Sequence, residues 1–415
     1  MTTVMLKISF HTFGCKNNLA DTNKIIKDLQ GFSEVELLDS EIVAGIHVIN
    51  TCTVTASSDA QARNLLRRIN KHNKGAVVIV TGCSVRRNSD DYKKLKEEVK
   101  WAGNTLEVCD NLVDDIVKII KKKHHFTHNK VVEKNLKLFR TRVFVQIQDG
   151  CEHFCSYCIV PFVRGEPKSR DIKEIISEAQ ALENSGIKEL VITGINIGDY
   201  DGGLESVVSA ILKDTNSIRI RLSSLRPSRI TEELIELMNE KRVCPHLHIS
   251  LQSASDKVLN LMNRHDYTAK DFLSVCKMVD KKLGNRSPFI AADVIVGHPG
   301  EDEKAFLESF NVIEQSSLNK LHVFPYSPRP GTAAFSMKRP NSEQIVKRRD
   351  TLLDFSEKRF IASLKQMQGK TIEVLWETST YGHSENYYPV EGIGTPNTIE
   401  QIEVKVVDLA GQTLQ

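Results

Sequence analysis

Residues 143–158, Val-Phe-Val-Gln-Ile-Gln-Asp-Gly-Cys-Glu-His-Phe-Cys-Ser-Tyr-Cys, decide how the rest of the chain is interpreted. Apolar and polar residues alternate over 143–148, which predicts a β-strand. The strand runs into Cys151, Cys155 and Cys158, so we expect these thiols in the loop at its carboxyl end. Three thiolates in one loop can bind a soft metal centre. Closed iron–sulfur and zinc sites use four ligands, so a four-iron–four-sulfur cluster held by three cysteines keeps one iron free for a substrate.

This CxxxCxxC spacing resembles that of the radical S-adenosylmethionine (SAM) superfamily. The resemblance implies that the free iron chelates SAM and that an electron from the cluster releases a 5′-deoxyadenosyl radical. A zinc knuckle is the alternative, but zinc sites usually have a second CxxC or HxxxH pair nearby. His153 lies inside the motif and is interpreted as a loop residue, because the cysteines suffice without it.

The composition indicates a globular protein. A chain of 415 residues is long enough for two or three domains that each bury a core. Its 40% hydrophobic and 26% charged residues are ordinary for a soluble protein. No apolar run reaches the roughly 20 residues of a membrane span, and the start of the chain lacks a signal peptide's apolar region. We therefore expect a cytoplasmic protein with no membrane partner, whose nine cysteines serve metal or redox chemistry rather than disulfides.

Strand and helix patterns alternate over residues 1–120, which predicts a doubly wound parallel sheet. The expected strands are 8–13, 46–49, 76–80 and 105–108, and the expected helices are 21–30, 57–72, 90–99 and 112–120.

Cys15, Cys52 and Cys83 each come directly after an expected strand. The carboxyl ends of strands in an open α/β sheet form its binding crevice, so these cysteines can converge there and hold a second cluster. Buried thiols that act as small core residues are the alternative, but they would be expected within strands. Cys109 also follows a strand. It is either a cysteine without a role in this site or a substitute for one of the three.

The stretch 121–142 contains eight Lys/Arg and one Glu, a local net charge of +7. Such a stretch can bind a phosphate backbone. A solvated linker is an equally good interpretation.

Six strand–helix repeats from residue 143 to about residue 327 predict a partial (β/α)6 TIM-like barrel, whose active site would gather at the carboxyl ends of the strands. The expected strands are 143–148, 189–193, 218–222, 246–251, 289–296 and 321–324, and the expected helices are 171–185, 204–213, 228–240, 256–263, 269–282 and 303–315.

Four residues on these strands or just after them are candidate SAM contacts. Gly194 leaves room for a ligand near the backbone, Asn196 and Gln252 offer amide donors and acceptors, and Asp293 is the acid nearest the end of the fifth strand. Ordinary turn chemistry is the alternative for each. Arg264 could pair with a carboxylate, although an arginine at a helix end is more often on the surface.

After an expected helix over 342–366, the last 50 residues change character. Expected strands at 371–376 and 402–407, with glycine-containing turns between them, predict a small β-barrel. Its aromatic residues could stack on bases: Tyr381, His383, Tyr387 and Tyr388. Residues 366–415 contain two Lys and seven Asp/Glu, a balance of −5, which suits a phosphate binder poorly, so these aromatic residues are alternatively core.

With both cysteine sets in place, the whole chain resembles the methylthiotransferase family. The resemblance implies two 4Fe-4S clusters, an auxiliary one on Cys15, Cys52 and Cys83 and a radical one on Cys151, Cys155 and Cys158, with SAM as cofactor. It also implies four segments: an N-terminal domain with the auxiliary cluster at 1–122, a basic linker at 123–142, a radical SAM barrel at 143–366 and a TRAM-like β-barrel at 367–415.

Two segments, 244–253 and 382–387, resemble the MtaB branch of this family. That branch implies transfer of a methylthio group to C2 of N6-threonylcarbamoyladenosine at position 37 of tRNA, with the tRNA anticodon loop and an electron donor such as flavodoxin or ferredoxin as partners. Alternative substrates are N6-isopentenyladenosine of tRNA and an aspartate of a ribosomal protein. A non-catalytic, zinc-binding RNA-binding protein is a further alternative.

Overall fold

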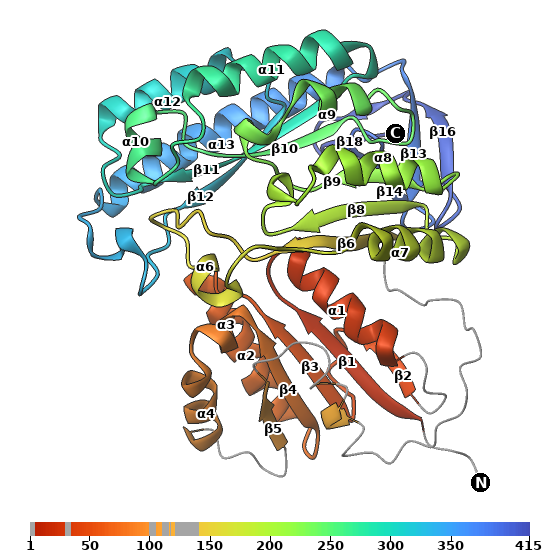
Figure 1. The fold of residues 1–415 in the computed structure, drawn as a ribbon, viewed down its shortest axis with the longest axis vertical. Helices are drawn as coiled ribbons and strands as arrows, with labels where there is room; N and C mark the ends of the chain where they lie inside the picture. The colour runs from red at the N-terminus through yellow and green to blue at the C-terminus, as the bar shows by residue number, and fades with distance from the viewer. Residues whose placement is uncertain (1–4, 30–34, 99–104, 110–115, 117, 121–140) are drawn as a thin grey trace.

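The computed structural model describes residues 5–29, 35–98, 105–109, 116, 118–120 and 141–415. Residues 121–140, the larger part of the basic stretch, and part of the expected helix at 112–120 lie outside these ranges. The described chain forms an N-terminal sheet, a barrel-like core and a C-terminal sheet (Figure 1). The predicted α/β class with this order of parts is confirmed.

The N-terminal sheet has five parallel strands in the order β2-β1-β3-β4-β5. Because the chain winds outward from β1 on both sides, the carboxyl ends of β1 and β3 lie at the switch point where such sheets bind ligands. The elements are β1 (Leu6–Thr12), α1 (Lys16–Leu29), β2 (Val35–Asp39), β3 (Ile46–Thr51), α2 (Ala56–His72), β4 (Val77–Gly82), α3 (Cys83–Arg87), α4 (Ser89–Glu98) and β5 (Thr105–Val108).

The sequence missed some of these elements. Strand β2 is partly exposed at the sheet edge and has no clear alternation, and α3 is only five residues long. Helix α1 begins at Lys16 rather than at residue 21, because Asn17 and Asn18 are weak helix formers and hide its first turn. Both asparagines are buried, which is the first sign that the start of α1 belongs to a site.

The barrel-like core consists of parallel strands β6, β8 and β9 and parallel strands β10, β11 and β12, joined by single bridges between Ile220 and Val243 and between Leu225 and Ile249. Helices α7 to α12 cover its outer face (Figure 1). The elements are β6 (Arg142–Asp149), α6 (Val160–Arg164), β7 (Lys168–Ser169), α7 (Ile172–Asn184), β8 (Glu189–Gly194), α8 (Leu204–Asp214), β9 (Arg219–Leu222), α9 (Glu232–Leu237), β10 (His246–Gln252), α10 (Asp256–Leu261), α11 (Ala269–Leu283), β11 (Phe289–Val296), α12 (Glu303–Gln315), β12 (Lys320–Pro325) and α13 (Ser342–Lys365).

All six expected barrel strands are present, but the helix expected at 228–240 is shorter. Only 232–237 forms the α-helix α9, because Pro227 opens a separate 3-10 turn and Thr231 caps the helix through a hydrogen bond from the Leu234 amide to its hydroxyl. The short helix α6, which directly follows the cysteine loop, was not expected.

The C-terminal sheet has six strands in the order β16-β13-β14-β15-β18-β17. The strand expected over 402–407 is wrong: β16 ends at Glu403, and the amides of Lys405 and Val406 instead donate to the carbonyl of Gln415. The chain turns there because the buried Val404 enters the core of this sheet. The strands are β13 (Thr371–Trp376), β14 (Tyr381–Ser384), β15 (Pro389–Glu391), β16 (Ile399–Glu403), β17 (Val407–Asp408) and β18 (Thr413–Leu414).

The C-terminal sheet covers the amino-terminal end of the barrel strands. There the buried Glu189 pairs with Arg219 and Arg221, each at 2.7 Å. Arg221 also donates to the carbonyls of Ser384 (3.2 Å) and Glu385 (3.1 Å). A buried charge needs both a counter-ion and further hydrogen bonds, and the C-terminal backbone supplies the latter.

The aromatic residues of the C-terminal domain differ in burial. Tyr388 is buried in the core with Phe289 and Phe360, and Tyr387 packs against His246 and His383. Tyr388 is therefore a core residue, whereas Tyr387 is partly buried where the C-terminal sheet meets the barrel. Base stacking stays a prediction for Tyr381, His383 and Tyr387. Among the described helices, none combines the length and the apolar character needed to cross a membrane.

Candidate active site

The loop after β6 brings Cys151, Cys155 and Cys158 together. Gly150 begins it with a φ of +75°, and a Cβ there would lie 1.9 Å from the Glu166 carbonyl oxygen, so only glycine fits. The Cys151 amide donates to the Gly165 carbonyl (3.0 Å), and the Cys158 amide donates to the Cys155 carbonyl (2.9 Å). These bonds fold the loop back on itself at the carboxyl end of β6.

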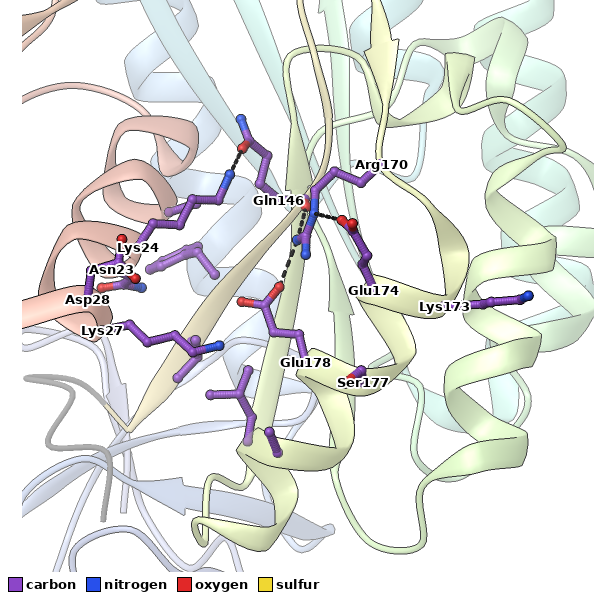
Figure 2. A pocket seen from close by; sticks show the side chains of 15 residues that line it. Asn23, Lys24, Lys27, Asp28, Gln146, Arg170, Lys173, Glu174, Ser177 and Glu178 are labelled. Carbon is purple, nitrogen blue, oxygen red and sulfur yellow. Dashed lines mark hydrogen bonds and ion pairs between the residues drawn. The ribbon is translucent and has the colours of Figure 1, made fainter. Parts of the chain in front are cut away.

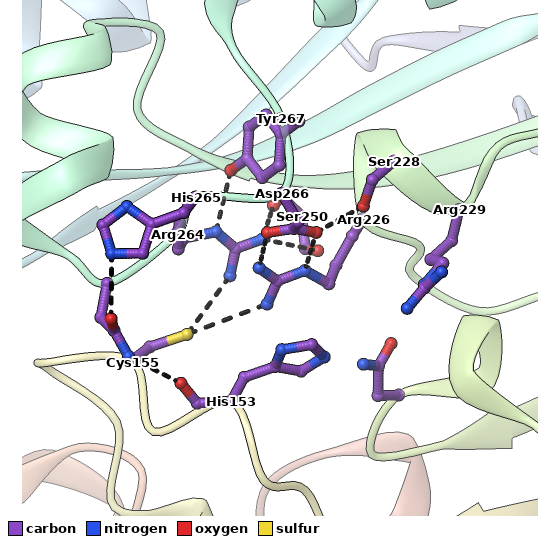
Figure 3. Close-up of polar contacts among 12 residues, drawn as sticks. His153, Cys155, Arg226, Ser228, Arg229, Ser250, Arg264, His265, Asp266 and Tyr267 are labelled. Carbon is purple, nitrogen blue, oxygen red and sulfur yellow. Dashed lines mark hydrogen bonds and ion pairs between the residues drawn. The ribbon is translucent and has the colours of Figure 1, made fainter.

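The environment of these thiols suits a metal cluster. Burial raises the pKa of Cys158 to about 12 and also raises that of Cys151, and the other cysteines of the set contribute to both shifts. Arg226 and Arg264 each point an Nη1 at Cys155 Sγ, at 3.9 and 3.8 Å (Figure 3). Guanidinium groups favour the thiolate form that metal binding requires.

Arg264 is only 4% exposed, so the surface position considered more common is wrong for it. It donates to the Ser250 carbonyl (2.7 Å) and to the Tyr267 hydroxyl (2.8 Å). Arg226 is held by an ion pair with Asp266 (Figure 3). Arg226 could not be predicted as a site residue, because an arginine after a short strand has many ordinary roles.

His153 lies in the loop as expected, and it also ties the loop to the end of β8. Its Nε2 lies 2.6 Å from Asp199 Oδ2, and Asp199 also pairs with Arg229 at 2.6 Å. Asn196, one of the candidate SAM contacts, donates to the same carboxylate through its side-chain Nδ2. Its backbone amide donates to Gln148 Oε1 (2.8 Å).

The other candidate SAM contacts occupy different environments. A side chain at Gly194 would meet the Gln148 carbonyl oxygen at 2.8 Å, so packing against β6 already explains the glycine. Gln252 ends β10 with a φ of +65°. Asp293 lies three residues before the end of β11, and its Oδ1 is 2.8 Å from His248 Nε2. Their roles as ligand contacts stay predictions.

The inner face of the barrel carries two histidines, His248 and His322, that sequence reasoning missed. His248 bonds Asp293 and stacks on His322 with ring centroids 5.0 Å apart. Lys16, from the start of α1, reaches toward this group from the N-terminal domain. Burial, with a smaller effect of the Arg221 charge, lowers its pKa to about 8, and the charge of Asp293 opposes the shift. Within the described part of the chain, the Lys16 side chain makes no hydrogen bond or ion pair.

The second cysteine set also converges. Cys15 Sγ and Cys83 Sγ lie 3.9 and 3.8 Å from Asn18 Oδ1. Cys52 lies beside them, since a Cβ on Gly14 would be 2.6 Å from its sulfur and the charges of Cys15 and Cys83 affect its pKa. Burial raises the pKa of Cys52 to about 11. Cys109 packs instead in the hydrophobic core with Ile8 and other apolar residues.

Each set brings three thiols together in the part of the chain that the structure describes. In the described residues, no three His, Cys, Asp or Glu side chains are close enough to hold a single metal ion. A cluster places iron and sulfide between its thiolates, so it suits a wider spacing than one zinc ion does. The donor chemistry of both sets therefore fits a cluster better than zinc.

A groove of about 730 Å³ lies between α1 and the barrel, lined by Lys24, Gln146, Arg170, Glu178 and neighbours (Figure 2). Arg170 pairs with Glu178 at 2.7 Å, and Lys24 bonds Gln146 across the domain junction. It contains none of the cysteines, so it belongs to the junction rather than to the cysteine sites.

Comparisons with known proteins agree with this geometry. The model of the Radical SAM superfamily matches residues 145–313, and that of Uncharacterized protein family UPF0004 matches residues 7–103. A radical S-adenosylmethionine methyltransferase, TsrM from Kitasatospora setae, solved with cobalamin and a 4Fe-4S cluster, has a TM-score of 0.53 at 13% identity, covering 80% of this chain and 77% of its own. At that identity the likeness shows the fold alone. Fold, cysteine loop and family model together define a radical SAM enzyme.

Curated relatives narrow the class. The chain is 32% identical over 412 residues to threonylcarbamoyladenosine tRNA methylthiotransferase MtaB of Aquifex aeolicus, covering 94% of this chain and 97% of the relative. It is 33% identical over 436 residues to MtaB of Bacillus subtilis, covering 97% and 94%. It is 31% identical over 400 residues to tRNA-2-methylthio-N(6)-dimethylallyladenosine synthase of Clostridium novyi, covering 88% and 84%. The chain belongs to the methylthiotransferase family, in its MtaB branch. Membership implies SAM and a 4Fe-4S cluster as cofactors.

Proposed function

We propose that this enzyme adds a methylthio group to C2 of N6-threonylcarbamoyladenosine at position 37 of tRNA. The observation that carries the proposal is the presence of two converging three-cysteine sets, one at the switch point of the N-terminal sheet and one at the carboxyl end of β6. The names of the MtaB relatives support the choice of substrate.

In this proposal Cys151, Cys155 and Cys158 hold the radical cluster, and Cys15, Cys52 and Cys83 hold a second 4Fe-4S cluster. When bound, these groups and SAM would supply a hydrogen-abstracting 5′-deoxyadenosyl radical and a sulfur atom that becomes methylated. The candidate SAM contacts are Gly194, Asn196, Gln252 and Asp293. The proposed partners are the tRNA anticodon loop and an electron donor such as flavodoxin or ferredoxin, in the cytoplasm.

The protein's own residues prepare these sites. Arg226 and Arg264 direct N–H groups at Cys155 Sγ. Hydrogen bonds to ligand sulfurs tune an iron–sulfur centre and orient its ligands. The proposal keeps the four segments 1–122, 123–142, 143–366 and 367–415. The C-terminal segment has a structural role in it, because this segment closes the amino-terminal end of the barrel.

Lys16 supports the threonylcarbamoyl substrate over the isopentenyl one. The threonylcarbamoyl group ends in a carboxylate, whereas the isopentenyl group is apolar. Lys16 directly follows Cys15 and reaches the inner face of the barrel without an ion-pair partner in the described part of the chain. In this proposal its ammonium group pairs with the substrate carboxylate and holds the base between the two cysteine sets.

Mass spectrometry of tRNA nucleosides from cells with and without the gene tests the proposal. We expect the methylthio derivative of N6-threonylcarbamoyladenosine to disappear without the gene and to return when wild-type protein is supplied. If that methylthio derivative is unchanged and the methylthio derivative of N6-isopentenyladenosine is lost instead, the substrate is N6-isopentenyladenosine.

Variants of the two cysteine sets test the roles within the mechanism. Cys155→Ala should abolish SAM cleavage, whereas Cys52→Ala should leave cleavage but give no thiomethylated product. Loss of cleavage in both variants would contradict separate roles for the two sets.

A further inference from the structure

The short helix α6 touches both cysteine sets. Its first residue, Val160, donates its amide to Cys158 Sγ at 3.4 Å. Its last residue, Arg164, donates Nε–H to Cys83 Sγ at 3.3 Å. Five helical residues rise only about 7.5 Å along the axis. One compact element therefore contacts a sulfur of each set.

Arg164 uses all three guanidinium nitrogens at the domain junction. In addition to the Cys83 bond, Nη1 donates to both carboxylate oxygens of Asp149, at 3.2 and 3.0 Å. Nη2 donates to Asn18 Oδ1 at 2.6 Å and to Asp21 Oδ2 at 2.9 Å. The side chain is fully buried. Only a planar guanidinium can reach these acceptors at once, so lysine would not be an equivalent residue.

The acceptors belong to both domains and lie next to both sets. Asn18 Oδ1 lies close to Cys15 and Cys83, and its Nδ2 is fixed by the carbonyls of Phe13 (2.8 Å) and Thr51 (3.0 Å). Asp149 is the last residue of β6 and accepts the amide of Gly150, which begins the radical loop. Arg164 thus joins the centre of one set to the base of the other.

We propose that Arg164 is a positioning residue with two effects. It fixes the separation between the two cysteine sets, and its hydrogen bond to Cys83 Sγ raises the reduction potential of the cluster held there. This inference rests on the proposed function, because it requires a cluster on Cys15, Cys52 and Cys83. A cationic N–H donor at a ligand sulfur stabilises the reduced, more negative cluster, which is the physical reason for the second effect.

A second buried arginine at the junction provides a matched control. Arg329, in the loop after β12, crosses into the N-terminal domain and pairs with Asp59, with a further bond to Thr53 at 2.7 Å. The Arg329 side chain is 4% exposed and that of Arg164 is fully buried, and each joins the two domains. Arg329 has no bond to a cysteine among its contacts. Its removal weakens domain docking without removing a donor to sulfur.

The experiment compares full-length wild type, Arg164→Met, Arg164→Lys and Arg329→Met after anaerobic reconstitution. Iron and sulfide are counted first. The midpoint potential of the auxiliary cluster is then measured by redox titration with electron paramagnetic resonance, in chains whose Cys151, Cys155 and Cys158 are also changed to alanine. The ratio of thiomethylated tRNA to 5′-deoxyadenosine is measured in chains that retain those cysteines.

We expect Arg164→Met to shift the auxiliary midpoint to a more negative potential and to lower the product ratio at least tenfold while SAM is still cleaved. Arg164→Lys should have a midpoint potential between those of Arg164→Met and wild type, because lysine keeps the positive charge. Its product ratio should stay low, because lysine lacks the planar guanidinium that reaches several acceptors at once. Arg329→Met should leave the midpoint where wild type has it.

An unchanged midpoint and product ratio in Arg164→Met, with full iron content, would overturn the inference and leave the proposed function standing. If Arg164→Met binds no auxiliary cluster, the midpoint potential of Arg164→Lys is used instead. A midpoint equal to that of wild type would then overturn the inference. Wild type with about four iron atoms per chain instead of about eight would overturn the proposed function itself.

Discussion

His246 of β10 and Tyr387 of the C-terminal sheet pack with ring centroids 4.8 Å apart. Arg221 lies over the same tyrosine ring at 4.8 Å from its centroid. The two segments that mark the MtaB branch in the sequence, 244–253 and 382–387, therefore contact each other at the amino-terminal end of the barrel. That contact joins a domain to the barrel, and it lies on the far side of the strands from the cysteine loop.

This packing makes Tyr387 a stability residue. Tyr387→Ala removes the ring contacts with His246 and Arg221, and we expect it to lower the free energy of unfolding by about 2 kcal/mol. Chemical denaturation followed by circular dichroism measures the change. Tyr381→Phe, which keeps the ring, should change stability little. Unchanged stability in Tyr387→Ala, together with weaker tRNA binding, would instead show that the ring stacks on a base.

Gly150 and Gly165 form a matched pair for the cysteine loop. Both have positive φ, but a Cβ at Gly150 would clash with the Glu166 backbone, whereas a Cβ at Gly165 meets nothing within 4 Å. Gly165→Ala should cost about 1–3 kcal/mol of backbone strain but meets no steric clash. Gly150→Ala must distort the loop, so we expect it to lose the radical cluster and its iron. Equal iron contents in the two variants would contradict this account.

Lys16→Met tests the proposed carboxylate contact. Loss of one charge-assisted hydrogen bond should lower kcat/KM for tRNA carrying threonylcarbamoyladenosine by about 10- to 100-fold. Cleavage of SAM without tRNA should stay near the wild-type rate. Lys24→Met, two turns along the same helix and in the groove, is the control and should change kcat/KM little. A tRNA-dependent rate in Lys16→Met equal to that of wild type would argue against the contact.

The N-terminal sheet should lose stability in mild acid. Burial, with a smaller effect of Arg68, lowers the pKa of His11 to about 4, and burial together with His11 lowers that of His47 to about 4. The unfolded chain takes up these protons near pH 6.5 and the folded chain only near pH 4, so stability is full above pH 7 and falls between these values. For one histidine the loss is roughly 3 kcal/mol.

Denaturation midpoints measured from pH 7.5 to pH 4.5 test this dependence. His11→Gln should flatten the profile, since His11 Nε2 lies 3.1 Å from His47 Nδ1 and both are buried. His265→Gln, at an exposed histidine, should leave the profile unchanged. A wild-type profile that is flat across pH 6.5 to 4.5 would rule out the buried neutral pair.

Regular elements with a clear period were predictable from the sequence. The continuous apolar run of β4 and the alternation in β6 identified strands buried in parallel sheets, and α12 was placed at its observed bounds. Short or edge elements were not predictable. Helix α6 and strand β2 take their conformation from their neighbours, so their own residues carry little periodic signal.

The candidate site likewise contains residues that could be predicted from the sequence and residues that could not. The six cysteines could be predicted as site candidates because they follow strands, and the geometry of a parallel sheet brings strand ends together. Arg164, Arg226 and Lys16 gave no such signal. The acceptors of Arg164 come from two domains and meet only where these pack. Arg226 contacts Cys155 and Asp266, which are distant in the sequence and lie together only in the folded barrel.

The sequence alone determined the class of this protein, because cysteine spacing and strand order can be read from the chain without knowing how the domains pack. Only the tertiary structure decided how the two cysteine sets face each other. That relation depends on Arg164, whose acceptors come from residues 18, 21, 83 and 149 and meet only after the two domains pack. A buried guanidinium requires all its partners in place, so the arrangement is specified by the packed junction and by no single stretch of the chain.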